Sequence, residues 1–419
     1  MSDALAHGPL SGLRVLEVTD EKGQFCGKLL ADLGADVIKI EPPGGDHCRQ
    51  VGPFLDDVPH PDRSLYFWYY NTSKRGITLA IDTAAGKELF RRLASDADVI
   101  VESQAPGYMA GLGLGYDALA ELRPSLIMCS LTPFGQSGPW RDYRTTELLH
   151  MAAGGQMASC GYDESDVPGH EPIAPGGGNA WHMGAHYAYM GIMAALVHRS
   201  VSGEGQYIDA SIHDACALTT EAAVPIYIYR DEMVNRHTGR HHDVNTPART
   251  QFQGADGYYV CALVSNQLSP AYVKRLHAML DEFGMAGDLG DPRYEDAKFV
   301  QERAGYIVDT LVADFIASKP AEDIYHIAQS RGFTWAAVRA AEELLDDEHL
   351  ADRAFWKTVS HPELERSFTY PGEAAIYSDS PWQIRSRAPL VGEHNQSVYG
   401  DELGMDLVKL QALTQDEVI

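Results

Sequence analysis

The sequence has few basic residues for its length. Its 419 residues include 33 Lys and Arg against 59 Asp and Glu, which gives a formal net charge of −26. Nucleic acids and anionic membrane surfaces are bound through clusters of basic side chains. The composition therefore argues against both as partners and favours small molecules and other proteins.

Long hydrophobic runs and paired cysteines are also missing. No stretch approaches the roughly 20 apolar residues of a membrane-spanning helix, and Met1–Leu13 lacks the pattern of a secretory signal. The six cysteines are scattered without a CxxC pair, which is typical of reduced proteins with buried thiols. We therefore expect a cytoplasmic protein. The cysteines are Cys26, Cys48, Cys129, Cys160, Cys216 and Cys261.

Several catalytic signatures are absent, since no Walker A, HExxH or GxSxG pattern occurs. Gly111-Leu-Gly-Leu-Gly115 resembles a dinucleotide-binding loop. That loop belongs in the first strand-to-helix turn, which here is Thr19–Gln24. We interpret the glycines as a turn before a helix that starts at Tyr116.

Histidines and glycines near the middle of the chain have structural interpretations. His182 and His186 lie four residues apart on one helix face and are predicted to be core or interface residues. The run Pro175-Gly-Gly-Gly178 is either a simple helix entry or an anion site at a helix N-terminus. A further polar group lacks strict metal-ligand spacing and is predicted to be a solvated linker: His237, His241, His242 and Asp243.

The first 135 residues alternate between short apolar runs and amphipathic stretches. Such alternation predicts a doubly wound parallel sheet, an α/β fold of Rossmann-like type. Later, 179–199 is a long apolar helix, and a new unit starts near Asp256. The predicted strands are 13–18, 36–40, 76–81, 98–102, 126–131 and 207–212, and the predicted early helices are 25–33, 84–94 and 116–122.

Eight segments, in order along most of the chain, resemble family III CoA-transferases. They are Leu10–Val15 (LSGLRV), Leu29–Glu41 (LLADLGADVIKIE), Asn71–Arg75 (NTSKR), Phe134–Pro139 (FGQSGP), Gly191–Leu196 (GIMAAL), Gly203–Asp209 (GEGQYID), Arg249–Phe252 (RTQF) and Ala388–His394 (APLVGEH).

The resemblance implies a domain organisation. A large Rossmann-like domain would comprise residues 1–200 and the C-terminal tail 395–419. A linker, 201–245, would lead to a smaller α+β domain at 246–345, and 346–394 would be the return linker. Two such rings interlock in the dimers of this family.

The resemblance also implies a chemistry in which an aspartate attacks an acyl-CoA thioester and forms a mixed anhydride. That aspartate lies ten residues before the glycine of the Gly-Ile motif, which is Gly191 here. The position is occupied by Trp181. Indole has no nucleophilic oxygen, so no catalytic residue is expected in this chain.

The CoA contacts implied by the family are degenerate too. The positions that correspond to them hold Lys74, Ser103 and Gln104. Expected basic residues are replaced by Pro42 and Gly111. In addition, the first turn carries two acids, Asp20 and Glu21, which disfavour a phosphate.

The sequence therefore resembles the non-nucleophilic subunit of a heteromeric family III enzyme, such as those of aromatic-compound degradation. The resemblance implies a homologous catalytic partner and transfer of CoA from a donor such as succinyl-CoA to a carboxylic acid. CoA thioesters would be substrates, with no tightly bound cofactor and no metal. Two alternatives remain: altered, racemase-like or lyase-like chemistry using Glu147, His150 or His182, and an acyl-CoA-binding module.

Overall fold

The protein is described here from a computed structural model that places residues 8–163, 166–264 and 267–419. The first seven residues, which belong to the segment examined for a secretory signal, lie outside the described part. The chain forms two compact units. The larger unit contains the described residues up to Gly154, then Gly176–Thr219 and Glu348–Ile419; the smaller contains Gly155–Pro175 and Thr220–Asp347.

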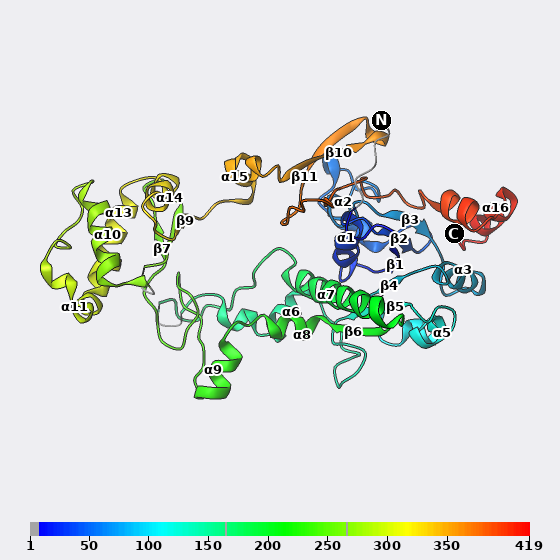
Figure 1. The fold of residues 1–419 in the computed structure, drawn as a ribbon, viewed down its shortest axis with the longest axis horizontal. Coiled ribbons are helices and arrows are strands. Elements are labelled where there is room, and N and C mark those ends of the chain that lie inside the picture. The colour runs from blue at the N-terminus through cyan, green and yellow to red at the C-terminus, as the bar shows by residue number, and fades with distance from the viewer. Residues whose placement is uncertain (1–7, 164–165, 265–266) are drawn as a thin grey trace. The chain divides into compact units, whose positions relative to one another are not determined.

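A six-stranded sheet forms the centre of the larger unit (Figure 1). All its neighbouring strands are parallel, in the order β3-β2-β1-β4-β5-β6. The strands are β1 (Arg14–Val18), β2 (Asp36–Glu41), β3 (Arg75–Thr78), β4 (Val99–Glu102), β5 (Ile127–Thr132) and β6 (Tyr207–Ser211). The predicted doubly wound parallel sheet is confirmed.

Helices cover both faces of this sheet, which explains why β4 and β5 are buried along their whole length. One face packs against α3 (Ala84–Ala94), α4 (Tyr108–Gly111), α5 (Tyr116–Ala120) and α16 (Leu407–Gln415). On the other side α1 (Gln24–Asp32) packs against α7 (Asn179–Ser202), which lies along β5 and β6. The side chain of Thr83 caps α3 by accepting a hydrogen bond from Gly86 N.

Small residues let α7 approach the sheet closely. Gly184, Ala185 and Ala188 are buried on its inner side. A Cβ atom at Gly184 would lie 2.7 Å from Ile212, so only glycine fits there without a shift of its neighbours. This close packing fixes the first turns of α7 against Leu131 of β5 and Ile212, which follows β6.

The segment predicted as the first linker, 201–245, is partly built into the sheet. Strand β6 lies in it and pairs with β5 over five residues, from Met128–Tyr207 to Thr132–Ser211. Helix α8 (Ile212–Leu218) follows, and the side chain of Ser211 caps its N-terminus by accepting a hydrogen bond from Asp214 N. The alternating pattern of 207–212 indicated a strand, but nothing local indicated its partner, because sheet pairing depends on contacts distant in sequence.

Residues after 347 return to the larger unit and include a hairpin that the sequence did not indicate. Its strands are β10 (Trp356–His361) and β11 (Arg366–Pro371). The segment beyond it contacts the larger unit: Gln383 N donates to Asp32 O, and Ser73 N donates to Ser386 O. Val418 and Ile419 pack in the same hydrophobic core as Leu16 and Val18 of β1.

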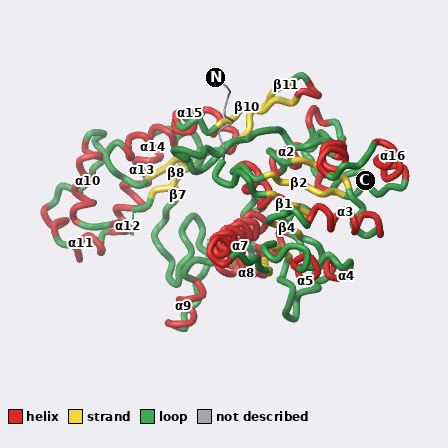
Figure 2. Tube along the Cα trace, turned by 45° about the vertical axis from the view of Figure 1, so that its right-hand side comes forward, coloured by secondary structure: helices red, strands yellow, loops and turns green. Residues whose placement is uncertain are grey.

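The smaller unit has its own core around a three-stranded antiparallel sheet, β7-β8-β9. Figure 2 shows β7 and β8 in yellow beside α13 and α14. The strands are β7 (Gln251–Gln253), β8 (Tyr259–Ala262) and β9 (Trp335–Ala337); the main helices are α9 (Ala223–Arg230), α10 (Pro270–Asp281), α11 (Ala297–Glu302), α13 (Ala313–Ala317) and α14 (Ala321–Gln329). In the described part of the chain, no helix is long and apolar enough to span a bilayer.

Two further short helices of the larger unit complete the site. They are α2 (Leu65–Tyr70), capped by Ser64, and α6 (Glu147–Ala153). Helix α6 lies in a part of the chain for which the sequence pattern predicted no helix. Its seven residues are too few for a clear helical period, so tertiary contacts decide its conformation.

Candidate functional site

A cleft lies at the carboxyl ends of β1 and β2, where the strand order of the sheet reverses between β1 and β4. In open α/β sheets, ligands bind in the crevice where the strand order reverses in this way. The cleft has a volume of about 340 Å³. It is lined by Val18, Thr19, Asp20, Ile40, Glu41, Pro42, Pro43, Asp46, His47, Leu79, Ala80, Ile81, Asp82, Gln104 and Tyr108.

The charge of this cleft is acidic. Asp20, Glu41, Asp46 and Asp82 line it, and neither Lys nor Arg is among its described lining residues. The cations that pair with two of these acids, Lys39 and Arg49, are buried behind the wall and are at most 1% exposed. Asp20 is paired with the partly exposed Lys22. A phosphate entering the cleft would therefore meet carboxylates, while the nearby cations Lys22, Lys39 and Arg49 are already engaged with them.

Two predicted CoA-contacting residues, Ser103 and Gln104, tie β4 to the turn after β1. The Ser103 hydroxyl donates to Asp20 Oδ1 at 2.8 Å and accepts from Asp20 N at 3.0 Å. Gln104 Nε2 donates to Val18 O at 3.2 Å. Gln104 lines the cleft, whereas the hydroxyl of Ser103 is used in this internal link.

The third predicted residue, Lys74, is not at the surface of the cleft. It is 1% exposed, and its Nζ lies 2.7 Å from Glu17 Oε2. The same Nζ donates to Gln24 O and Asn71 Oδ1. Burial lowers the pKa of Lys74 to about 8, and the Glu17 carboxylate opposes this effect. Lys74 therefore stabilises the frame beneath the cleft and is not available to a phosphate.

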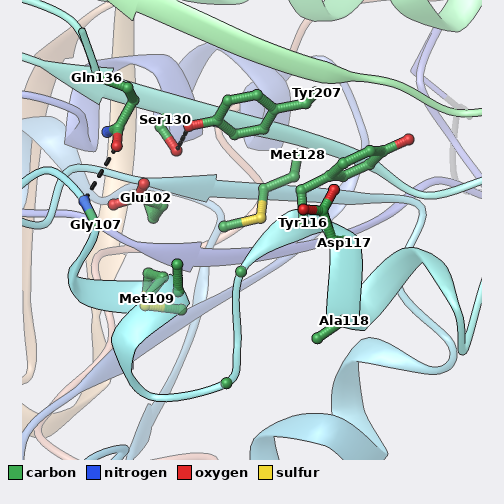
Figure 3. A pocket seen from close by; sticks show the side chains of 13 residues that line it. Glu102, Gly107, Met109, Tyr116, Asp117, Ala118, Met128, Ser130, Gln136 and Tyr207 are labelled. Atoms are coloured by element: carbon green, nitrogen blue, oxygen red, sulfur yellow. Dashed lines mark hydrogen bonds between the residues drawn. The ribbon is translucent and has the colours of Figure 1, made fainter.

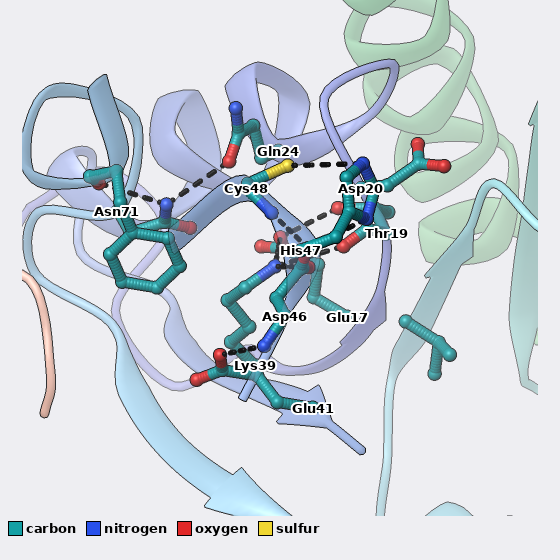
Figure 4. A network of polar contacts seen from close by, with 12 residues as sticks. Glu17, Thr19, Asp20, Gln24, Lys39, Glu41, Asp46, His47, Cys48 and Asn71 are labelled. Carbon is teal, nitrogen blue, oxygen red and sulfur yellow. Dashed lines mark hydrogen bonds and ion pairs between the residues drawn. The ribbon is translucent and has the colours of Figure 1, made fainter. Parts of the chain in front are cut away.

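A buried polar network connects this frame to the cleft wall (Figure 4). Lys39 Nζ lies 3.6 Å from Glu17 and 3.0 Å from Asp46. The pKa of Asp46 is lowered to about 2: burial opposes ionisation, but the Lys39 charge and a bond from Cys48 N outweigh it. Glu17 and Lys39 interrupt apolar strands in the sequence, and this interruption was the signal that could have revealed the network.

Trp181 lies at the third position of α7 and is half-buried. Its ring contacts His150 of α6, with 5.5 Å between ring centroids. The preceding Gly178 has φ 69°, a left-handed conformation that suits the turn into the helix. An indole ring thus occupies the place that the resemblance assigns to the nucleophile.

A carboxylate of the protein, that of Glu147, already lies at the N-terminus of α7. Glu147 Oε1 accepts a hydrogen bond from Ala180 N at 3.3 Å. A carboxylate at a helix N-terminus satisfies free N–H groups and the helix dipole. The run 175–178 is therefore a helix entry in which one N–H is bound to a side chain of the protein.

His182 is paired with Tyr70 of α2. The Tyr70 hydroxyl lies 2.7 Å from His182 Nε2, and Phe25 of α1 stacks on the imidazole at 4.4 Å between centroids. Burial raises the pKa of Tyr70 to about 12 and lowers that of His182. His182 is a half-buried packing residue, while His186 is exposed. These contacts place the start of α7 beside α1 and α2.

His150 is buried without a hydrogen-bond partner for either ring nitrogen among the described residues. Its ring lies between Phe134, Trp181 and His213. Burial, followed by the charges of His213 and Lys22, lowers its pKa to about 4. The imidazole is therefore neutral at physiological pH.

A second cavity of about 650 Å³ lies at the face covered by α4 and α5 (Figure 3). Met109 and Met128 form its apolar wall, and Glu102 lies at its polar end. Gln104 N donates to Glu102 Oε2 at 2.7 Å, and Tyr207 donates to Ser130 at 2.9 Å. Burial raises the pKa of Glu102 to about 7.

The histidine-rich segment belongs to the smaller unit and is more ordered than a solvated linker. His237 is buried, with Nδ1 2.7 Å from Asp163 Oδ2. His241 and His242 stack on each other, and each has Nε2 3.2 Å from Glu221 Oε2. The prediction of a solvated linker is wrong for His237, because the pairing with Asp163 is invisible in local sequence.

The fold and this site can be compared with known proteins. The profile of the family described as CoA-transferase family III matches residues 10–395. The chain belongs to CoA-transferase family III.

Among its relatives is the succinyl-CoA:(R)-benzylsuccinate CoA-transferase subunit BbsE of Thauera aromatica, which is 32% identical over 93% of each chain. The succinyl-CoA–L-malate CoA-transferase beta subunit of Chloroflexus aurantiacus is 29% identical over 98% of each chain. A CAIB/BAIF family protein from Brucella suis has a solved structure with TM-score 0.79 and 26% identity, covering 94% of this chain and 99% of that one. Family III CoA-transferases use CoA thioesters as substrates, which agrees with the substrate class expected from the sequence.

Proposed function

We propose that this chain is the non-nucleophilic subunit of a heteromeric family III CoA-transferase. The complex would move CoA from a donor thioester such as succinyl-CoA to a carboxylic acid. A homologous partner would supply the aspartate that attacks the thioester. The two chains would form the interlocked dimer expected from the sequence, so this subunit would complete the assembly.

The observation that carries this proposal is Trp181 at the start of α7. A nucleophile for acyl transfer needs an oxygen, sulfur or nitrogen lone pair that can form a covalent intermediate. Indole offers only an N–H donor. A carboxylate at the start of this helix, Glu147 of α6, accepts a hydrogen bond from Ala180 N.

The acidic cleft supports the same conclusion. CoA carries several phosphate charges, and such groups are usually bound by Arg, Lys or free backbone N–H groups. Here Asp20 and Asp46 line the cleft, and Lys74 is committed to Glu17. Two relatives are named as subunits, BbsE and a beta subunit, which supports a role within a multi-subunit enzyme.

Co-expression with a homologous partner that carries the aspartate tests the proposal. Each chain alone and both together would be supplied with succinyl-CoA and a panel of carboxylic acids, and acyl-CoA products would be measured by mass spectrometry. We expect activity only when the partner is present. We expect Trp181→Phe to change kcat of the complex by no more than about twofold, since no bond forms at this position. Transfer by this chain alone, at a rate typical of the family, would overturn the proposal.

Acid–base chemistry on the same fold is the alternative favoured by one observation, the 2.7 Å pair of Tyr70 and His182. A neutral imidazole beside a phenol can exchange a proton with a ligand that displaces either group. Under this alternative, His182→Gln in the intact complex lowers kcat by more than about a hundredfold. Under the main proposal it leaves kcat nearly unchanged.

A further inference from the structure

Three side chains with metal-binding atoms converge beside the cleft: Glu21, His47 and Cys48. Glu21 follows β1, whereas His47 and Cys48 belong to the short helix His47–Gln50 after β2. His47 Nε2 lies 2.6 Å from Glu21 Oε2. Cys48 Sγ lies 3.7 Å from the same oxygen and 3.9 Å from His47 Nε2.

These separations are close to those of a tetrahedral zinc site. With Zn–S near 2.3 Å and Zn–N or Zn–O near 2.0–2.1 Å, the edges of the tetrahedron are about 3.3–3.6 Å. The two edges to Cys48 exceed this range by a few tenths of an ångström. The edge between Glu21 and His47 is short because the two groups are hydrogen-bonded to each other. It would lengthen when a cation replaces the shared proton.

The surroundings of His47 resemble those of a metal-bound histidine. Such residues usually bind metal through one ring nitrogen and donate the other to a carboxylate. Here Nδ1 lies 3.2 Å from Asp46 Oδ1, which leaves Nε2 directed at Glu21. Asp46 is itself held by Lys39 Nζ at 3.0 Å and by Cys48 N at 2.9 Å.

Charge and access also fit a divalent cation. A glutamate and a thiolate together carry two negative charges, which Zn²⁺ neutralises. The His47 side chain is 63% exposed and lines the cleft, which provides a path of entry. In contrast, Glu221, His241 and His242 lie in the smaller unit, contain no sulfur ligand, and include a Glu221 that is 60% exposed.

We propose that Glu21, His47 and Cys48 bind one Zn²⁺ ion through Oε2, Nε2 and Sγ. Water or a ligand in the cleft completes the tetrahedron. The thiol proton of Cys48 and the proton shared by Glu21 and His47 leave to solvent as the ion enters. The ion cross-links the turn after β1 to the helix after β2, at one wall of the cleft. This site does not depend on the transferase role proposed above.

Cobalt titration of the full chain, or of its native complex, tests the site after treatment with a chelator. Co²⁺ bound by a thiolate in tetrahedral geometry gives an intense visible spectrum and a sulfur-to-metal charge-transfer band in the near ultraviolet. We expect one equivalent of Co²⁺ to produce both and Zn²⁺ to abolish them. The absence of a charge-transfer band from the unmodified protein would refute the proposal.

Matched variants identify the ligands. Cys48→Ser removes the charge-transfer band, whereas Cys261→Ser, at an exposed cysteine, leaves it unchanged. His47→Ala weakens Co²⁺ binding by more than about tenfold, and its exposed side chain makes it tolerant of substitution should Cys48→Ser not fold. His241→Ala has no effect. A band that persists in Cys48→Ser, or an unchanged affinity in His47→Ala, would overturn the assignment.

Discussion

Lys74 Nζ and Glu17 Oε2 lie 2.7 Å apart, and both side chains are fully buried beneath the cleft. A buried pair of this kind costs desolvation energy on forming, but it is costlier to leave one partner alone. The pair therefore holds β1 against the loop before β3 and contributes no exposed charge to ligand binding.

Removal of one partner should destabilise the protein strongly. We expect Lys74→Met to lower the free energy of unfolding by about 3–5 kcal/mol, because the buried Glu17 carboxylate loses its closest cation and keeps only Lys39, at 3.6 Å, which also pairs with Asp46. The double variant Lys74→Met/Glu17→Gln should be more stable than Lys74→Met alone. Urea unfolding of the two variants provides the measurement. Equal stability of Lys74→Met and the unmodified protein would contradict the buried pairing.

Glu102 should make stability fall as pH rises. Its pKa is about 7 in the folded protein, above its ordinary value, because burial disfavours the charged form. The folded state therefore holds its proton more tightly than the unfolded state. Its stabilising contribution is complete below the unfolded pKa and is lost as pH rises through about 7, a difference on the order of 3 kcal/mol.

The variant Glu102→Gln tests this dependence, since it keeps the shape of the side chain and removes the titration. Above pH 7 we expect it to unfold at a higher urea concentration than the unmodified protein. Glu121→Gln, at an exposed position of the same unit, serves as the control. Identical pH profiles for Glu102→Gln and the unmodified protein would exclude the buried, protonated carboxyl.

His150 should make the stability of the protein fall as pH falls. Its pKa is about 4, lowered by burial, so the folded state binds a proton less readily than the unfolded state. Stability is then lost as pH falls from the ordinary histidine pKa through about 4, amounting to about 2 kcal/mol at pH 5. His150→Phe, which suits the aromatic neighbours, should resist acid better than the unmodified protein. His349→Phe, at an exposed position, should not.

Restoring an aspartate should not restore catalysis. Under the proposed role, we expect Trp181→Asp alone to show no transferase activity, because Asp20 and Asp46 still line the cleft and the cations beside them, Lys22 and Lys39, are already paired. Incubation with succinyl-CoA followed by hydroxylamine trapping would detect an acylated enzyme. Trapping of a stoichiometric adduct would contradict the view that the CoA cleft is degenerate as well as the nucleophile.

Local features were predictable from the sequence, and long-range features were not. The strands around Leu16 and Val101 follow from apolar runs between turns, and Trp181 follows from a fixed distance to Gly191. The burial of Lys74 was not predictable, because its partner Glu17 is set by the packing of two strands and a loop. The convergence of Glu21 on Cys48 likewise depends on the parallel register of β1 and β2.

The return of the C-terminal segment has a consequence for biosynthesis. Val418 and Ile419 pack in the core that contains Leu16, and Ala80 N donates to Val418 O. The sheet emerges first from the ribosome but cannot close its core until these residues follow. Long-range closure of this kind slows folding and leaves apolar surface exposed in the meantime. The nascent larger unit should therefore depend on chaperones until synthesis reaches this segment.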